Sequence, residues 1–448
     1  MHITLVSPRM SLRPMDSEYK RHMSPSLSLL TLAALTPSQH TVCIADENSK
    51  PLRMHPVTDL VGITVTVDTA YRAYDIADAY RQLGIPVILG GIHASACPDE
   101  AEQHADSVCI GEAEPVWIEI LTDCQNKKLK KRYAASRPVD PATIPIPRWE
   151  AIDQSAYLYT NIICASRGCP FRCEFCYNSC SYVHPGHRAR PVAQVVAEIE
   201  RLPTRHVMFI DDNFIGNPAW TKELLQAIEP LGLKWNAAVS ANIGKYPELL
   251  DRMAATGCQS LFIGFETINE QALTRANKHQ NRVASYEQTI TAIHDRHIMI
   301  NASLVFGFDT DTPETFPATL DWLVRNRIET MTAHILTPYP GTKLYQRYIK
   351  ENRIIDKNWS QYNTAHVVFK PHQLTAAELY TGYLWMYDQF YSWKNIWKRL
   401  PLAPRQRMPY LLFNLGYRKF GKLTSMLANH GCMHALGRLA RRLAYGIE

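Results

Sequence analysis

The chain has 448 residues, of which 46% are hydrophobic and 20% charged, and its formal net charge at pH 7 is +6. This length and composition predict a globular protein of two or three domains, each large enough to bury its own core. We find neither a signal-peptide pattern nor an uninterrupted apolar run of roughly 18 residues, so we expect no membrane span. The 11 cysteines are irregularly spaced, which excludes a secreted disulfide framework and favours a reducing, cytoplasmic location.

Residues 1–133 alternate between strand-like and helix-like patterns. Apolar strand patterns fall at 3–6, 42–45, 60–65, 86–89 and 107–110, and helical periodicity falls at 26–35, 71–83 and 114–121. This alternation predicts a parallel, doubly wound sheet, that is, a Rossmann-like domain. Such sheets bind ligands outside the carboxyl ends of their strands.

Three loops rich in small or polar residues follow those strands. They are Thr-Val-Thr at 64–66, Gly-Gly-Ile-His-Ala-Ser at 90–95 and Gly-Glu-Ala-Glu at 111–114. Paired glycines allow a flat or bulky ligand to approach the backbone closely. The simpler interpretation of each loop alone is a tight turn between a strand and a helix.

Residues 134–156 are predicted to link two domains. Pro138, Pro141, Pro145 and Pro147 fall close together here. Proline-rich segments are stiff and extended and are common at domain boundaries. We therefore expect this segment to cross the outside of the molecule.

Residues 157–350 contain about six further strand–helix units, too few for a full eight-stranded barrel. We expect a partial (β/α)6 barrel, with its chemistry at the carboxyl ends of the strands. Two such ends are Asp-Asp-Asn-Phe at 211–214 and Gly-Phe-Glu-Thr at 264–267. An acidic pair such as Asp211 and Asp212 also suits the capping of a helix.

The most informative stretch, residues 169–176, reads Cys-Pro-Phe-Arg-Cys-Glu-Phe-Cys. Three thiolates in one short loop suit a thiophilic metal centre, either zinc or an iron–sulfur cluster. A structural zinc site requires a fourth ligand, which Cys180 or His184 could supply. In that case the chain would be a non-catalytic, zinc-stabilised binding protein.

This cysteine spacing, with an aromatic residue before the third cysteine, resembles the radical SAM (S-adenosylmethionine) superfamily. The resemblance implies a [4Fe–4S] cluster held by three cysteines, with one iron open to S-adenosylmethionine and with flavodoxin or ferredoxin as electron donor. The implied cluster ligands are Cys169, Cys173 and Cys176.

The same resemblance assigns roles to three further residues. It implies that Phe175 lies against the adenine of S-adenosylmethionine and that Glu266 holds its ribose or amino group. Asp212 is expected near the methionyl group and the substrate.

The loops at 90–93 and 111–114, and Ile-Pro-Ile-Pro-Arg-Trp at 144–149, resemble those of cobalamin-dependent radical SAM enzymes. The Asp-x-His-x-x-Gly motif of other cobalamin domains is absent, as is usual in this branch. The resemblance implies that a corrin lies over the strand ends of the first domain, and whether a histidine there touches cobalt stays open. The implied neighbours of the corrin are Thr64, Thr66, Gly90, Gly91 and His93.

Residues 351–448 are predicted to form a helical extension. Its aromatic residues recur at helical spacing and are expected to be mostly core, and residues 390–400 resemble the anaerobic magnesium-protoporphyrin cyclase-like branch of the family. Residues 394–448 hold 11 Lys and Arg but one acidic residue, Glu448. A basic amphipathic tail over 411–443 allows peripheral contact with an anionic membrane, although a solvated helix face is the simpler interpretation. No nucleic-acid-binding module accompanies the charge.

These patterns predict an α/β protein with four parts. They are a Rossmann-like cobalamin-binding domain (1–133), a linker (134–156), a partial radical SAM barrel (157–350) and a helical basic extension (351–448). The resemblance implies a C-methyltransferase that uses a [4Fe–4S] cluster, S-adenosylmethionine and cobalamin on an unactivated carbon of a small-molecule or lipid-like substrate. The alternatives are a radical cyclase or rearranging enzyme with the same cofactors, and the zinc-stabilised binding protein.

Overall fold

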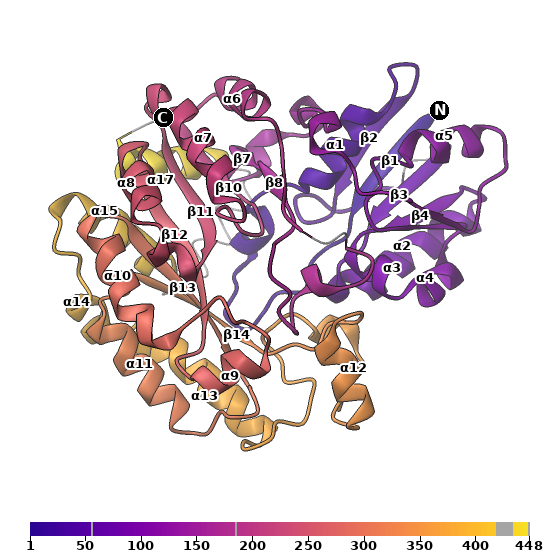
Figure 1. The fold of residues 1–448 in the computed structure, drawn as a ribbon. Helices are drawn as coiled ribbons and strands as arrows, with labels where there is room; N and C mark the ends of the chain where they lie inside the picture. The colour runs from indigo at the N-terminus through magenta and orange to yellow at the C-terminus, as the bar shows by residue number, and fades with distance from the viewer. Residues whose placement is uncertain (55–56, 184–185, 418–432, 447–448) are drawn as a thin grey trace.

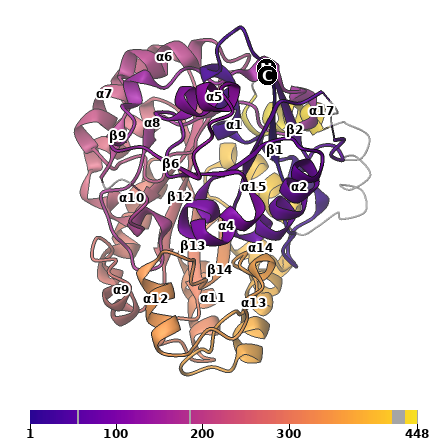
Figure 2. The ribbon, with the colours of Figure 1, turned by 90° about the vertical axis from the view of Figure 1, so that its right-hand side faces the viewer.

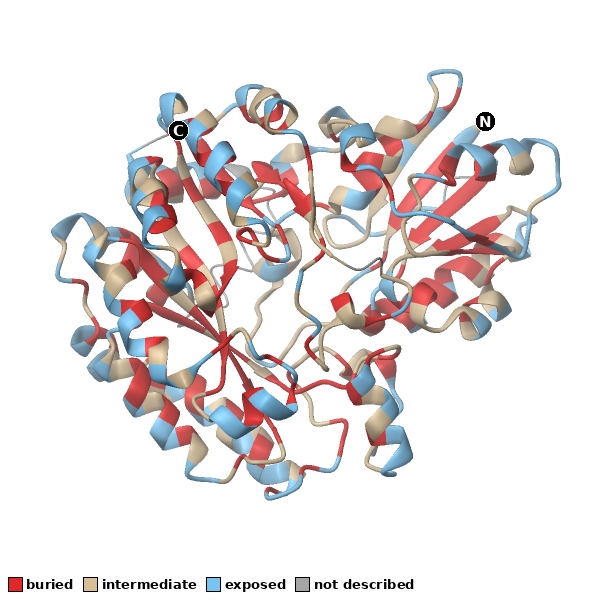
Figure 3. Ribbon diagram, in the orientation of Figure 1, coloured by how far each residue is buried: buried red, intermediate tan, exposed pale blue. Residues whose placement is uncertain are grey.

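The computed structural model describes residues 1–54, 57–183, 186–417 and 433–446. It contains two six-stranded sheets, one after the other along the chain, with helices packed around them (Figure 1). The strands are mostly buried, whereas the outward faces of the helices are exposed (Figure 3). The predicted α/β class, with a Rossmann-like sheet followed by a partial barrel, is confirmed.

The first sheet is parallel and has the strand order β2-β1-β3-β4-β5-β6. Helices α1 and α5 cover one face, and α2, α3 and α4 cover the other. The sequence analysis missed β6, a short strand that directly follows two lysines. The strands are β1 (His2–Ser7), β2 (Thr41–Asp46), β3 (Leu60–Thr64), β4 (Val87–Gly90), β5 (Ser107–Ile110) and β6 (Arg132–Ala134); the helices are α1 (Leu27–Leu35), α2 (Ala70–Gln82), α3 (Ile92–Ala96), α4 (Pro98–His104) and α5 (Trp117–Gln125).

The second sheet is also parallel and has the order β14-β13-β12-β11-β10-β7. Since β7 and β14 are its two edge strands, the barrel is open between them. Residues 169–176, which carry Cys169, Cys173 and Cys176, are called the cysteine loop below. A short antiparallel pair, β8 (Ser166–Arg167) with β9 (Arg188–Ala189), flanks this loop. The strands are β7 (Ile162–Ile163), β10 (His206–Phe209), β11 (Lys234–Ser240), β12 (Cys258–Glu266), β13 (Met299–Phe306) and β14 (Thr330–Ile335); the helices are α6 (Val192–Glu200), α7 (Pro218–Ile228), α8 (Pro247–Ala255), α9 (Glu270–Arg275), α10 (Tyr286–Asp295), α11 (Thr315–Arg325) and α12 (Lys343–Lys350).

The C-terminal extension covers the β14 edge of the barrel (Figures 1 and 2). The Tyr387 hydroxyl accepts a hydrogen bond from the backbone N–H of Ala333 at 3.0 Å. The Tyr391 hydroxyl accepts one from the backbone N–H of Met331 at 3.1 Å. An open edge strand leaves such groups unpaired, so these buried tyrosines complete β14. The described helices are α13 (Ala376–Phe390), α14 (Trp393–Lys398), α15 (Pro404–Tyr417) and α17 (Met433–Tyr445).

No helix among the described residues is long and apolar enough to cross a membrane. The predicted basic tail lies partly outside those residues, because 418–432 are not described.

Ion pairs join the first sheet to the cysteine loop. The carboxylate of Glu112, which follows β5, accepts hydrogen bonds from Arg167 at 3.2 Å, from Arg188 at 2.7 and 3.1 Å, and from the Val139 N–H at 2.9 Å. Burial alone would raise the pKa of Glu112, but the hydrogen bond from Arg188 and the two guanidinium charges outweigh it and lower the pKa. Glu114 also pairs with Arg167. Two half-buried arginines are thus held against one loop of the other domain.

We predict that Glu112→Gln loosens the contact between the two domains. The neutral amide leaves both guanidinium groups without their shared charge partner, which costs about 1–3 kcal/mol. This loss should speed trypsin cleavage of the linker at Arg148 about tenfold. Because the pKa of Glu112 is lowered in the folded state, its contribution is present above the ordinary glutamate pKa and lost as the pH falls through the lowered one.

Limited proteolysis with small-angle X-ray scattering measures this loosening. The matched control is Glu150→Gln, which removes an exposed linker pair with Arg148 and should change nothing. Equal cleavage rates in the two variants would contradict the prediction.

Candidate functional site

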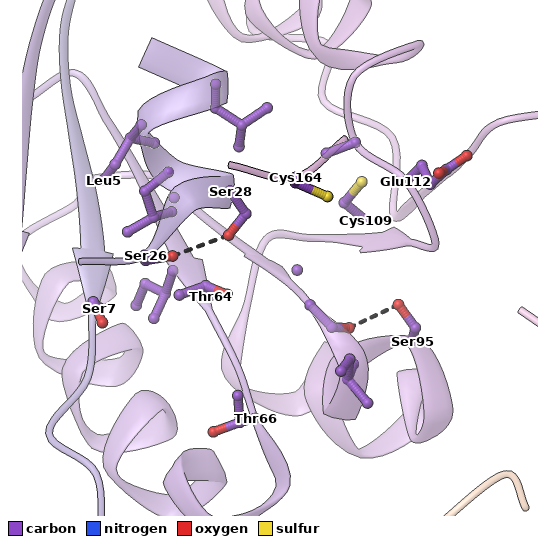
Figure 4. A pocket seen from close by; sticks show the side chains of 18 of the residues that line it. Leu5, Ser7, Ser26, Ser28, Thr64, Thr66, Ser95, Cys109, Glu112 and Cys164 are labelled. Carbon is purple, nitrogen blue, oxygen red and sulfur yellow. Dashed lines mark hydrogen bonds between the residues drawn. The ribbon is translucent and has the colours of Figure 1, made fainter. Parts of the chain in front are cut away.

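A cavity of about 730 Å³ lies between the two sheets. Its first wall is formed by the carboxyl ends of β1, β3, β4 and β5, and its second by the segment that leads into the cysteine loop. Figure 4 shows Cys164 of the second domain projecting toward the same space as Cys109 and Glu112 of the first. Side chains from both domains therefore share one enclosure, whose volume suits a bound cofactor or substrate.

Four of the five residues predicted near a corrin line this cavity, namely Thr64, Thr66, Gly90 and Gly91. His93 is fully buried but is not part of the lining. Its imidazole Nε2 lies 3.2 Å from Glu100 Oε1, and its ring packs edge-on against Trp359 at 5.1 Å. The structure thus brings the threonines and glycines together and places the histidine behind them.

Gly91 shapes the strand-end wall. Its φ of 99° is one that side chains rarely allow, and an added Cβ would lie 2.9 Å from the backbone of Val65. The hydroxyl of Ser95 joins this loop to the next, because it donates to the Gly91 carbonyl at 2.7 Å and accepts from the Gly111 N–H at 2.9 Å (Figure 4). The wall is therefore bare backbone held in fixed position.

The cavity also extends down the α1/α5 face of the first sheet. Gly62, Ile88 and Cys109 on the strands, and Trp117 on α5, line this extension. At Gly62 an added Cβ would lie 3.0 Å from Leu5. A narrow apolar slot beneath a wide mouth was not predicted, since single small residues within strands carry no distinctive sequence signal.

The three predicted cluster ligands lie on one loop. Cys173 is buried and Cys169 and Cys176 are partly buried; burial raises the pKa of the Cys176 thiol to about 12. Two side-chain amides point at the thiols: Asn213 Nδ2 is 3.9 Å from Cys169 Sγ, and Gln280 Nε2 is 3.6 Å from Cys173 Sγ. Such N–H donors suit sulfur that carries negative charge, as cluster ligands do.

Glu266 forms a buried ion pair at the end of β12. Its carboxylate lies 2.6 Å from Lys278 Nζ, and both side chains are 9% exposed. The φ of Glu266 is 66°, unusual for a residue with a side chain, and β12 is irregular between Gly264 and Glu266. A Cβ on Gly264 would lie 2.6 Å from the Glu266 carboxylate. Strain of this kind marks functional positions.

Phe175 belongs to the cysteine loop, and Asp212 follows β10. Phe175 packs edge-on against Phe308 with ring centres 6.2 Å apart, inside the barrel. Asp212 lines the cavity, accepts a hydrogen bond from the Gly168 N–H at 2.9 Å and another from the Tyr177 hydroxyl. Asp211 instead points into the core and bonds to Ser166, and burial raises its pKa to about 6. Only the second aspartate of the pair faces the cavity.

Among the described residues, no group of three or more His, Cys, Asp or Glu side chains, with or without Cys180, is arranged to hold a metal ion. Cys180 is buried, and an added Cβ on Gly341 would lie 3.3 Å from its Sγ. His184 lies outside the described residues.

Sequence reasoning missed Lys278, Asn213, Gln280, Arg167 and Glu112 as site residues. Asn213 and Glu112 are each part of a predicted strand-end motif, and Arg167 stands two residues before the cysteine motif. Lys278 and Gln280 lie in a polar loop after α9, where nothing in the local sequence distinguishes them from solvent-exposed residues.

Comparisons with known proteins agree with this geometry. The family model for the radical SAM superfamily matches residues 163–323. The chain is 33% identical over 394 residues to bacteriochlorophyllide d C-12(1)-methyltransferase of Chlorobaculum tepidum, covering 85% of this chain and 86% of the relative. It is 29% identical over 437 residues to bacteriochlorophyllide d C-8(2)-methyltransferase of the same organism, covering 93% and 96%.

The fold is similar to that of a solved methyltransferase. The structure of TsrM from Kitasatospora setae, with cobalamin and a [4Fe–4S] cluster bound, superposes with a TM-score of 0.62 at 18% identity, covering 98% of this chain and 99% of that one. The chain therefore belongs to the radical SAM superfamily, in the family of these methyltransferases.

Proposed function

We propose that this enzyme methylates an unactivated carbon of a tetrapyrrole bound in the cavity between the first sheet and the cysteine loop. The observation that carries the proposal is the single cavity of about 730 Å³ that the strand ends share with the two segments flanking the cysteine loop, residues 164–168 and 177–183. Two relatives that cover most of this chain are named as methyltransferases of bacteriochlorophyllide d, a large planar molecule.

The first wall fits a corrin. Gly90 and Gly91 leave backbone without side chains over the strand ends, and Thr64 and Thr66 add hydroxyl groups beside them. The slot past Gly62 would accept the tail of the cofactor. No histidine lines the cavity among the described residues, so this wall would hold the corrin by shape and by hydrogen bonds.

The barrel side fits S-adenosylmethionine and a cluster. Cys169, Cys173 and Cys176 would hold the cluster, Phe175 would lie against the adenine, and Glu266 would accept hydrogen bonds from the ribose or amino group. Lys278 orients the Glu266 carboxylate through their buried ion pair.

The bound cofactors supply a hydrogen-abstracting radical and a carrier for the methyl group, and the chain supplies position. Asp212 and Tyr177 fix the cysteine loop at Gly168, next to the cavity. The pairing of Glu112 with Arg167 and Arg188 holds the corrin wall opposite that loop. Reactive groups are thereby kept close to one another and away from bulk water.

Two further roles concern partners. The amides of Asn213 and Gln280 would stabilise added negative charge on the cluster, which would ease its reduction by a donor such as flavodoxin or ferredoxin.

Trp393 and Trp397 are 48% and 59% exposed on α14, beside Lys394 and Lys398. Exposed tryptophans with lysines suit peripheral contact with an anionic membrane.

We predict that Gln280→Met makes the cluster harder to reduce. Methionine has a similar length but cannot donate to Cys173 Sγ, so the reduced, more negative cluster loses a stabilising hydrogen bond. A redox titration followed by electron paramagnetic resonance should show a more negative potential. Gln259→Met, in β12 and bonded only to the Gly257 carbonyl, should keep the original potential; a common shift in both variants would contradict the assignment.

The function itself is tested by anaerobic reconstitution with iron, sulfide and hydroxocobalamin, followed by turnover with bacteriochlorophyllide d. We expect about four irons and one cobalt per chain, a methylated product, and both S-adenosylhomocysteine and 5′-deoxyadenosine. Cys173→Ala should lose iron and both products, whereas Cys180→Ala should keep them. Deoxyadenosine without stoichiometric S-adenosylhomocysteine would indicate a cyclase-type reaction, and zinc without iron would overturn both enzyme assignments.

A further inference from the structure

The connection between β1 and α1, residues 8–26, is unusually long for a turn of a Rossmann-like sheet. Most strand–helix connections in such sheets have about 2–6 residues, and much longer ones are often functional. This segment, indigo in Figure 1, leaves the first sheet and passes between it and the barrel. The length and path of residues 8–26 therefore suggest a role other than joining β1 to α1.

The segment closes the open side of the barrel. Near β7, the carbonyls of His22 and Met23 accept hydrogen bonds from Leu158 and Tyr159 N–H, each at 2.8 Å. At its other end, Met15 packs against the core of the barrel. Residues 8–26 thus cross the gap that the missing barrel strands leave between β7 and β14.

The charged side chains of this segment are mostly neutralised within it. Arg13 forms two hydrogen bonds with Asp16, at 2.9 and 3.0 Å. Arg21 pairs with Glu18 and donates to the Met10 carbonyl. These contacts explain why the segment keeps its shape.

Lys20 is different. Its side chain lines the cavity with Met10, Arg21 and Met23. In residues 1–54, 57–183, 186–417 and 433–446, no ion pair or side-chain hydrogen bond engages its ammonium group. Surrounding protein and the charge of Arg13 lower its pKa, whereas the charge of Asp16 raises it. Lys20 is exposed rather than buried, so its ammonium group is accessible to an anion that enters the cavity.

The facing barrel strand does not supply that anion. His334 on β14 lies close enough to respond to the same charges: burial first, and then Arg13 and Lys20, lower its pKa to about 3. Its Nδ1 lies 3.1 Å from the Thr364 hydroxyl. A neutral imidazole adds no negative charge beside Lys20, and the nearby Asp16 carboxylate is already hydrogen-bonded to Arg13.

From this geometry we infer that Lys20 binds a carboxylate of the substrate, and that residues 8–26 form the wall that selects acidic substrates. The inference rests on the proposed function, since it concerns the substrate of that cavity. The ammonium group fixes the substrate at one end, while its reacting carbon lies between the corrin wall and the cysteine loop.

The test compares bacteriochlorophyllide d as the free acid with its methyl ester. Holoenzyme with S-adenosylmethionine is treated with formaldehyde and a mild reductant, and methylation of each lysine is quantified by mass spectrometry. We expect the acid, but not the ester, to reduce labelling of Lys20 about tenfold. The reference is Lys222, which is exposed on α7 and pairs with Glu248.

Variants provide a second measurement. Lys20→Met should raise KM for the acid about tenfold with kcat little changed and abolish the preference over the ester, while Lys20→Arg should keep that preference. Lys50→Met, which removes an exposed pair with Asp153, is the control and should behave as the unaltered enzyme.

Three outcomes would overturn the inference: equal protection by acid and ester, no protection by either, or protection by hydroxocobalamin before substrate is added. Failure of the proposed function is distinguishable, because it appears as absent S-adenosylhomocysteine while Lys20 is still protected by the acid.

Discussion

The relative position of the two sheets depends on one carboxylate, that of Glu112. It follows β5 of the first sheet and is bound by Arg167 beside the cysteine loop, by Arg188 on β9 and by the linker backbone at Val139. Because these groups are largely shielded from water, their attraction is weakened less than that of surface pairs. One side chain therefore joins three segments that are distant in sequence. It holds the strand ends opposite the segments that flank the cysteine loop, and these form two walls of one cavity.

Charged side chains are arranged differently in the barrel and in the segment 8–26. In the barrel, Glu266 and Lys278 neutralise each other, and their pairing holds a backbone conformation that would otherwise be strained. In the segment 8–26, Arg13 and Asp16 cancel, but Lys20 has no such partner among the described residues. The buried barrel pair would orient S-adenosylmethionine with its own charges already balanced, whereas the exposed ammonium group of Lys20 would gain its partner from a bound carboxylate.

Sequence patterns predicted the features that are encoded within a few residues. The cysteine spacing, the alternation of strands and helices and the strand-end glycines all belong to this kind. Pairings across the fold could not be predicted: Arg167 and Glu112 are 55 residues apart, and Lys278 lies in a polar loop 12 residues after Glu266. His93 shows that a sequence motif does not by itself predict where each of its side chains points. It was placed near the corrin because of its neighbours, but the short helix α3 directs its ring toward Glu100 and Trp359, behind the cavity wall.

The segment 8–26 links cofactor binding to substrate selection. By sequence it belongs to the Rossmann-like domain, yet it completes the wall of the barrel through Leu158 and Tyr159. The cavity therefore forms only when the two domains are in contact. A loosened Glu112 contact would move both the strand ends and the segment 8–26 away from the barrel. Connections between strands and helices also tolerate changes of length and composition far better than the sheets do. An enzyme of this architecture can thus change its substrate through one connecting segment, while the cluster, the corrin wall and their separation stay as they are.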